Sequence, residues 1–173
     1  SNGSEETFYH QIYKESNEYI INAFTYANKY ADKAVKLFYN DYGETEPVKV
    51  KCISELADAI KASSGARIDG IGMQAHYSME SPGTNELYNA IKEYGKHVVQ
   101  ITELDMLASK SYDGSAAQKE TEQTKQAYRY KEIIDTILKT KDEGVNITAI
   151  VFWGVADDDS WLLSPEFSQG RHN

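Results

Sequence analysis

The amino-acid sequence predicts a fold of the α/β class, in which parallel strands alternate with helices. Three observations support this prediction. Apolar residues recur at helical spacing in four segments, a short apolar run of strand length follows each segment, and glycine or proline residues separate the two kinds of segment. Strands that alternate with helices are typically parallel and joined by right-handed crossovers. The 173 residues are enough for one such domain, residues 1–173.

The helices are predicted from apolar periodicity and from residues that favour helix ends. Pro47 is typical of a first helical position, and Thr84 is a typical N-cap residue. Gly65, Gly95 and Gly144 follow the periodic segments at the points where helices should end. The predicted helices cover residues 5–30, 47–65, 84–95 and 116–141.

The predicted strands cover residues 35–39, 70–76, 98–104 and 147–153. Polar and aromatic residues gather at or just beyond the C-terminal ends of these strands: Asn40, Asp41, Tyr42, Gln74, His76, Glu103, Asp105, Trp153 and Trp161. The carboxyl ends of parallel strands form the catalytic face of (β/α)₈ barrels and the ligand-binding edge of open sheets. We therefore expect the functional site at this edge. Four strands are half of an eight-stranded barrel, and they cannot close a barrel alone.

The segment 101–106 carries the strongest chemical signal. It ends a predicted buried strand, where an unpaired ionised carboxylate is very costly, and yet it contains Glu103 and Asp105. Side chains two residues apart in a strand point to the same face. This arrangement suits a nucleophile or a general base held at the mouth of a barrel. An acid pair at the entry to a loop is the alternative interpretation.

The preceding strand ends in two polar residues, Gln74 and His76, which share one face of the predicted strand. A histidine beside a carboxylate can hold it by a hydrogen bond and keep it ionised, whereas a lone histidine is more often structural. Gly70 and Gly72 formally match a dinucleotide-binding pattern. That pattern requires a helix directly after the glycines, and none is predicted there. Glycines in a barrel strand also allow a close approach of the backbone.

Trp153 and Trp161 flank the loop after the last strand. Two indole rings beside one loop suit the flat apolar face of a sugar, and core packing is the alternative for each ring. The acidic residues 157–159 between them are potential calcium ligands, with a solvated loop as the default interpretation. The other histidines and Cys52 show no metal-ligand spacing, so we expect no metal and no other cofactor.

Composition limits the possible partners. The formal net charge of −9 argues against nucleic acid and against anionic membrane surfaces, because both select for basic patches. The single cysteine excludes a disulfide within the chain. The sequence has no run of about 18 apolar residues, the length that predicts a membrane-spanning helix.

Four segments together resemble glycoside hydrolase family 10, the xylanase family. They resemble the last four strands of its barrel in order. The first three cover residues 37–42, 70–76 and 101–105, and the fourth consists of residues 152–155 with residues 159–161. The resemblance implies a (β/α)₈ TIM barrel, of which this chain carries the C-terminal half, strands five to eight with their helices. It also implies an endo-β-1,4-xylanase, which hydrolyses internal bonds of xylan with retention of configuration.

By this resemblance Glu103 is the nucleophile, and His76 and Asp105 form the supporting hydrogen-bond network. A retaining glycosidase also needs a second carboxyl group about 5–5.5 Å away, which acts as acid and then as base. In the family, an Asn-Glu pair at the end of the fourth strand supplies it. The Asn-Glu pairs of this chain, at 17–18 and 85–86, lie in predicted helices. We therefore expect the chain to lack the acid/base and to be inactive alone.

The resemblance also implies how the substrate is held. Gln74, Trp153 and Trp161 line the subsites next to the cleaved bond, and Tyr42 contacts the sugar on the leaving-group side. Gly43 stands where family members often have asparagine, so no side-chain contact is expected from that position.

The expected partners are xylan or xylo-oligosaccharides and the missing N-terminal half-barrel, from the same or a second chain. Two alternatives remain open: a β-1,4-glucanase or cellobiosidase of the same family, and a non-catalytic carbohydrate-binding half-barrel. The protein is expected to be bacterial and either secreted or attached to the cell surface.

Overall fold

The computed structural model describes residue 12 and residues 16–168. In this part of the chain, helices and strands follow the predicted order, except that the second strand is split in two. The α-helices are α2 (Glu18–Tyr30), α3 (Pro47–Ala62), α4 (Thr84–Tyr94) and α5 (Ala116–Asp142). The strands are β1 (Phe38–Asp41), β2 (Gly70–Met73), β3 (His76–Ser78), β4 (Val98–Leu107) and β5 (Ile147–Phe152). Two 3₁₀ helices follow, η1 (Asp157–Asp159) and η2 (Trp161–Leu163).

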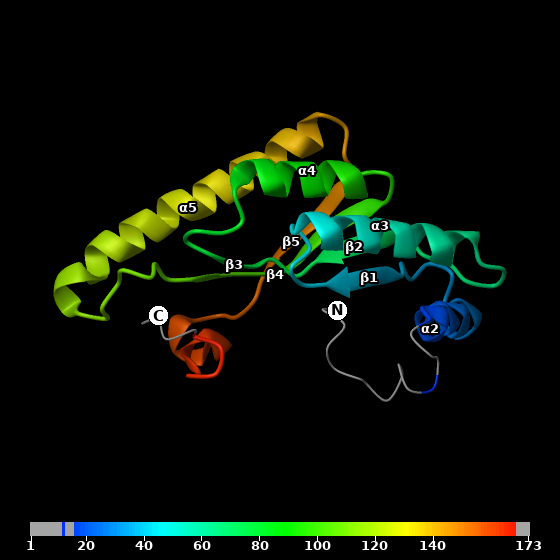
Figure 1. Ribbon diagram of the computed structural model, residues 1–173, viewed down its shortest axis with the longest axis horizontal. Helices are drawn as coiled ribbons and strands as arrows, with labels where there is room; N and C mark the ends of the chain where they lie inside the picture. Colours follow the sequence, from blue (N-terminus) through cyan, green and yellow to red (C-terminus); the bar gives the residue numbers. More distant parts are fainter. Residues whose placement is uncertain (1–11, 13–15, 169–173) are drawn as a thin grey trace.

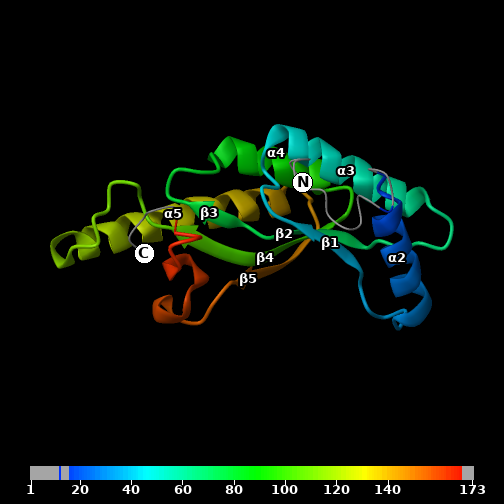
Figure 2. The ribbon, with the colours of Figure 1, turned by 60° about the horizontal axis from the view of Figure 1, so that its bottom comes forward.

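The strands form one parallel sheet. β2 pairs with β1 on one side and with β4 on the other. The opposite edge of β4 pairs with β5. β3 lies beside β4 beyond the end of β2, so β2 and β3 together run along one edge of β4 (Figures 1 and 2). The strands therefore cross the sheet in sequence order, as consecutive units of a β/α barrel do.

Helices α3, α4 and α5 cover one face of the sheet, and α2 packs against α3 near the β1 edge (Figures 1 and 2). Their apolar faces bury residues such as Ile60, Ile91 and Ile137 in one cluster with Ile71 and Ile101 of the sheet. The segment that contains η1 and η2 lies on the other side of the sheet (red in Figure 1). The core thus fixes the strands from the helix side and leaves their C-terminal ends free for a site.

The prediction of a single strand over 70–76 is wrong. β2 ends at Met73, Ala75 has a left-handed conformation with a φ of 64°, and β3 begins at His76. The reason lies in the pairing with β4. Met73 pairs with Ile101 and His76 pairs with Asp105. An advance of three residues from β2 to β3 must therefore match an advance of four residues along β4. The chain leaves the ladder at this corner and rejoins it one residue further along β4.

Other strand boundaries also differ from the prediction: β1 ends at Asp41 rather than at residue 39, and β5 ends at Phe152 rather than at residue 153. Two further differences arise because a ladder needs a partner. β1 begins at Phe38 rather than at residue 35, since Phe38 pairs with Gly70, the first residue of β2. β4 continues to Leu107 rather than ending at residue 104, since β3 extends its ladder through Ser78.

The helix starts also differ in detail. The first predicted helix is interrupted at Ser16 and Asn17, residue types that favour helix ends over interiors, and its residues 5–11 and 13–15 lie outside the described part of the chain. Thr84 is the first residue of α4 rather than its cap, and the side chain of Glu86 instead accepts a hydrogen bond from the backbone N–H of Gly83 at 2.9 Å.

No helix among the described residues has the length and apolar character that a membrane span needs.

The two glycines of β2 allow a close approach of neighbouring groups. A Cβ atom at Gly70 would overlap the carbonyl oxygen of Val98, and a Cβ atom at Gly72 would overlap the side-chain oxygen of Asn40. The chain continues from β2 into β3, and the next helix begins only at Thr84. The dinucleotide-binding interpretation therefore lacks the helix that it requires.

Candidate active site

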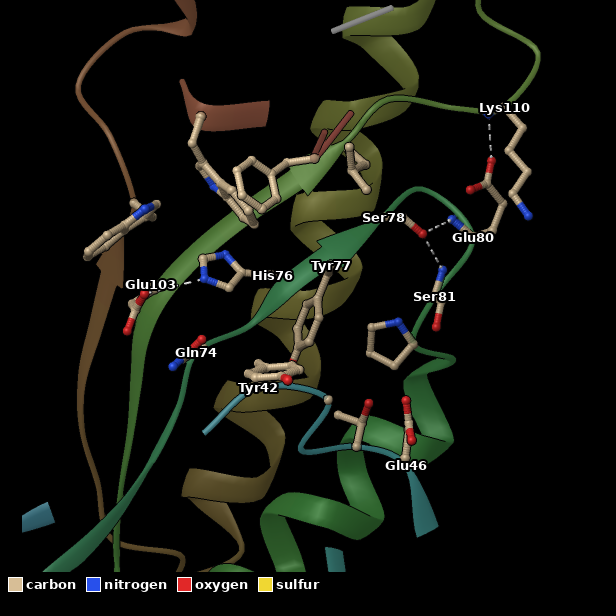
Figure 3. Close-up of a pocket in the computed structure, with 17 residues that line it drawn as sticks. Tyr42, Glu46, Gln74, His76, Tyr77, Ser78, Glu80, Ser81, Glu103 and Lys110 are labelled. Carbon is tan, nitrogen blue, oxygen red and sulfur yellow. Dashed lines mark hydrogen bonds and ion pairs between the residues drawn. The ribbon is translucent and has the colours of Figure 1, made fainter. Parts of the chain in front are cut away.

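The C-terminal ends of the strands and the loops that follow them surround an open pocket of about 870 Å³ (Figure 3). Six of the seven residues that the sequence predicts for the site line this pocket: Tyr42, Gln74, His76, Glu103, Trp153 and Trp161. The seventh, Asp105, is buried behind His76. The structure thus brings together residues that are up to 119 positions apart, from Tyr42 to Trp161.

Glu103 lies at an irregularity of β4. Ile101 pairs with Ile150 of β5 and Leu104 pairs with Phe152, so three steps along β4 match two along β5. An extra residue of this kind is a β-bulge, and bulges commonly redirect side chains next to active sites. The same stretch of β4 also contains the extra residue opposite the corner between β2 and β3.

The bulge lets two consecutive side chains reach the same partner, whereas in a regular strand they would point to opposite faces. The Nδ2 of Asn40 donates a hydrogen bond to the Oε1 of Glu103 at 2.8 Å. The hydroxyl of Thr102 donates to the Oδ1 of Asn40 at 2.7 Å, which fixes the orientation of the Asn40 amide. One oxygen of Glu103 therefore has a fixed donor.

The second oxygen of Glu103 meets a chain of three further side chains. The Nε2 of His76 lies 3.3 Å from the Oε2 of Glu103, and the Nδ1 of His76 lies 2.9 Å from the Oδ1 of Asp105. The Nε1 of Trp161 donates to the other oxygen of Asp105 at 2.6 Å. Glu103 and Asp105 thus face the same imidazole ring, in agreement with the same-face prediction.

His76 is a pH-sensitive member of this chain. Burial disfavours its charged form, but the hydrogen bond and charge of Asp105, together with Glu103, outweigh burial and raise the pKa of His76 above its ordinary value. The protonated ring can donate to both carboxylates. The neutral ring has a single N–H, which the shorter contact keeps toward Asp105, so that Glu103 loses a donor.

We expect the stabilising effect of His76 to decrease as the pH rises. Because the pKa of His76 is higher in the folded state than in the unfolded state, its contribution is fully present below the unfolded-state value of about 6.5. The contribution is then lost as the pH rises through the folded-state pKa. Urea unfolding of the wild type and of His76→Asn across this range should show a stability difference that shrinks toward alkaline pH.

His97 provides a control of opposite sign. Burial lowers the pKa of His97, so its pH-dependent contribution is present above the ordinary value and is lost as the pH falls. The difference between the wild type and His97→Asn should shrink toward acidic pH. If the His76→Asn difference instead grew with pH, the charged network described for His76 would be wrong.

The remaining predicted residues present open surfaces to the pocket. Trp153 is 50% exposed and lies edge-on to His76, with 6.3 Å between ring centroids. Tyr42 is 60% exposed, and the Nζ of Lys49 lies 3.9 Å from the centre of its ring. Gln74 lies next to His76 on the same wall of the pocket (Figure 3). Exposed ring faces beside polar groups suit a ligand that has both apolar faces and hydroxyl groups.

Trp161 differs from Trp153 because it contacts two other aromatic rings at short range. Its ring centroid lies 4.8 Å from that of His76 and 4.6 Å from that of Phe167. Core packing and site lining, which the sequence left as alternatives, are therefore combined in this one residue. Phe167 also lines the pocket, and sequence reasoning gave no signal for it.

Asn40 and Thr102 are the other site residues that the sequence analysis did not assign. Asn40 was visible as a polar residue at a strand end, but its contact with Glu103 depends on the bulge.

The acidic residues 157–159, which the sequence analysis considered as calcium ligands, form the exposed helix η1. Within the part of the chain that the structure describes, no group of three or more histidine, cysteine or acidic side chains is arranged to hold a metal ion.

Other carboxylates of the pocket lie away from Glu103. Glu46 and Glu80 line the pocket on the side opposite Glu103 (Figure 3). Glu80 accepts a hydrogen bond from the backbone N–H of Lys110 at 3.0 Å. Glu103 itself has Asn40 at one oxygen and His76 at the other.

A carboxylate that is held at the C-terminal edge of a parallel β/α sheet, beside two indole rings, is typical of carbohydrate-cleaving enzymes built on β/α barrels. The sequence model of the family named glycosyl hydrolase family 10 matches residues 2–171 of the chain, and the chain belongs to this family.

The relatives of the chain include xylanases of known sequence and structure. Endo-1,4-beta-xylanase B of Paenibacillus barcinonensis is 36% identical over 147 residues, which are 84% of this chain and 44% of that protein. The endo-1,4-beta-xylanase of Geobacillus stearothermophilus is 38% identical and matches 91% of this chain and 47% of that protein. A solved family 10 structure from Paenibacillus barcinonensis has a TM-score of 0.81 at 30% identity and matches 99% of this chain and 51% of that chain.

The chain therefore spans about half the length of these relatives, in their C-terminal region. Its fold is accordingly that of part of a (β/α)₈ barrel, and the TIM-barrel prediction is confirmed.

Proposed function

We propose that this chain supplies the nucleophile half of the catalytic domain of a retaining endo-β-1,4-xylanase. The observation that carries the proposal is the placement of Glu103. Its carboxylate lies in the pocket with Asn40 as a donor on one oxygen and His76 on the other. Contacts of this kind on both oxygens hold the carboxylate in one orientation, which a nucleophile requires.

In this mechanism the Glu103 carboxylate attacks the anomeric carbon while an acid protonates the leaving oxygen. The product of this step is a covalent glycosyl-enzyme. The group that acted as the acid, now deprotonated, then acts as a base and removes a proton from water. The water attacks the anomeric carbon and displaces Glu103. Each step inverts the configuration, so the two steps together give net retention. His76 and Asp105 keep Glu103 oriented between the two steps.

The acid/base belongs, in this proposal, to the part of the catalytic domain that the relatives have and this chain does not cover. The two Asn-Glu pairs of the chain are placed at helices rather than at strand ends: Glu18 begins α2, and Glu86 caps α4 through the N–H of Gly83. Neither pair lines the pocket that contains Glu103.

The sheet edges support a partner half-barrel. Among the described residues, no strand pairs with the outer edge of β1 or of β5. Val151 and Phe152 of β5 are 48% and 58% exposed. Open strand edges with exposed apolar side chains invite further pairing, and barrel closure removes such edges. The proposed partner is the N-terminal half-barrel, from the same or a second chain.

For the substrate we propose xylan, with Trp153, Trp161 and Gln74 at the subsites next to the cleaved bond and Tyr42 on the leaving-group side. Two solved relatives, at 38% and 39% identity, are complexes of glutamate-to-alanine variants with xylotetraose and xylotriose. A β-1,4-glucanase is the second candidate, because a relative named exoglucanase XynX, from Acetivibrio thermocellus, is 40% identical over 150 residues.

Product analysis on xylan and on a β-1,4-glucan tests the proposal. We expect the complete catalytic domain to release xylo-oligosaccharides from internal positions, faster than it cleaves the glucan. Proton NMR at early times should show the β-anomer first, since retention requires it. Faster cleavage of the glucan would reverse the substrate assignment, and an initial α-anomer would exclude the covalent mechanism.

We also propose a secreted or cell-surface location in a bacterium, because the substrate is a polysaccharide that cells cannot take up intact. One solved relative is described as an intracellular xylanase, so the location does not follow from the family. Fractionation of a culture of the source organism into medium, envelope and cytoplasm would decide this point.

A further inference from the structure

Glu44 is a buried acidic residue that the proposed mechanism does not use. It lies in the loop between β1 and α3, and 1% of its surface is exposed. Its Oε1 accepts hydrogen bonds from the backbone N–H of Ala75 at 3.2 Å and from the hydroxyl of Tyr77 at 2.9 Å. Its own carbonyl accepts from the hydroxyl of Tyr94, on α4, at 2.7 Å. Glu44 thus links the β1 loop, α4 and the corner between β2 and β3.

That corner is the point at which the sheet must absorb a register difference. Ala75 is fully buried, and its φ of 64° is a conformation that residues with a side chain rarely adopt. Such a conformation persists only where the surroundings hold it. The N–H of Ala75 lies outside the strand ladder, and without an acceptor it would be a buried unpaired donor.

The neighbours of Ala75 on both sides belong to the candidate active site. Gln74 precedes it, His76 follows it, and both side chains line the pocket (Figure 3). The rest of the corner is held through the backbone. The N–H of Gln74 donates to the carbonyl of Asp41 at 3.0 Å, and the N–H of Asp105 donates to the carbonyl of Ala75 at 3.3 Å.

We propose that Glu44 is a positioning residue for the catalytic network. Its buried carboxyl group holds Ala75 in the left-handed conformation and thereby fixes His76 against Glu103. The inference rests on the proposed function of Glu103. Burial raises the pKa of Glu44, but its Oε1 can accept these hydrogen bonds in either protonation state, so positioning does not require a charge.

The test uses the complete catalytic domain and an aryl β-xylobioside with a good leaving group, because formation of the glycosyl-enzyme then depends mainly on the nucleophile. Glu44→Ala should lower the rate of this step by about 10²-fold, the loss expected from a misplacement of about 1 Å, with little change in KM. Glu44→Gln keeps an acceptor oxygen in place and should stay within a few-fold of the wild type.

A second readout separates positioning from a general loss of structure. In Glu44→Ala the alkaline limb of the pH profile should move to lower pH, because His76 is no longer held against both carboxylates and its pKa returns toward the ordinary value. Replacement of Ala75 by glycine removes the cost of the left-handed conformation. The double variant Glu44→Ala/Ala75→Gly should therefore recover part of the lost rate.

Glu122 is a matched control. It is also a buried glutamate, and it accepts hydrogen bonds from the backbone N–H and the hydroxyl of Ser109, away from the corner. Glu122→Ala should leave the rate of the glycosylation step and the pH profile of the folded protein unchanged. Equal losses in Glu44→Ala and Glu122→Ala, or a folded Glu44→Ala with wild-type rate and pH profile, would overturn the proposal.

If Glu44→Ala does not fold, Glu44→Asp replaces it, because its shorter side chain cannot reach Ala75 and the same loss of rate is expected. An active Glu103→Gln variant would remove the proposed function itself. An inactive Glu103→Gln together with a fully active Glu44→Ala would remove only the positioning role.

Discussion

Replacement of Glu103 by glutamine should abolish xylan hydrolysis by the complete catalytic domain. An amide cannot form the glycosyl-enzyme, so we expect a loss on the order of 10⁴-fold or more, as for other enzymes that lose a covalent nucleophile. The fold should remain intact, because glutamine has the same shape and can still accept from Asn40. Steady-state rates on xylan and a thermal unfolding curve measure the two effects.

Two additions make this experiment decisive. Glu120→Gln makes the same chemical change at an exposed position of α5 and should leave the rate unchanged. Glu103→Gly leaves space for a small anion at the same place, so azide should restore turnover of an activated xyloside. A single displacement by azide would give the α-xylosyl azide. An active Glu103→Gln variant, or a β-azide product, would show that Glu103 is not the nucleophile.

The second large effect is expected from the chain by itself. The 173-residue chain should show no measurable xylan hydrolysis, because our proposal assigns the acid/base and half of the substrate groove to the other half of the catalytic domain. General acid catalysis alone is typically worth about 10²–10⁴-fold. Addition of the N-terminal half of a related family 10 barrel, expressed as a separate chain, should restore activity. Assays of each piece alone and of the mixture measure this effect.

The mixture also identifies where the acid/base lies. If a glutamate of the added half is the acid/base, its replacement by alanine should abolish the restored activity on xylan. The same mixture made with Glu103→Gln should be inactive as well, which shows that both halves contribute to one site. Hydrolysis of xylan at ordinary rates by the 173-residue chain alone would contradict the division of the two carboxyl groups that we propose.

Much of this protein was readable from its sequence. Apolar periodicity and helix-end residues placed three helices, α3 to α5, to within a few residues of their observed bounds, because these signals depend on neighbours within a few positions. The parallel order of the strands followed from their alternation with helices. The gathering of Gln74, His76 and Glu103 at one edge followed from their places at strand ends.

What the sequence could not show depends on how strands match across the sheet. The break at Ala75 and the bulge at Glu103 both arise because β4 has one more residue than each of its neighbours at that point. A strand pattern with a period of two contains no information about a partner's length.

The contacts of Asn40 with Glu103 and of Glu44 with Ala75 are consequences of those two irregularities. Sequence patterns therefore determined which residues could form the site. The register between strands, which is a property of the whole sheet, decided which side chains touch the nucleophile.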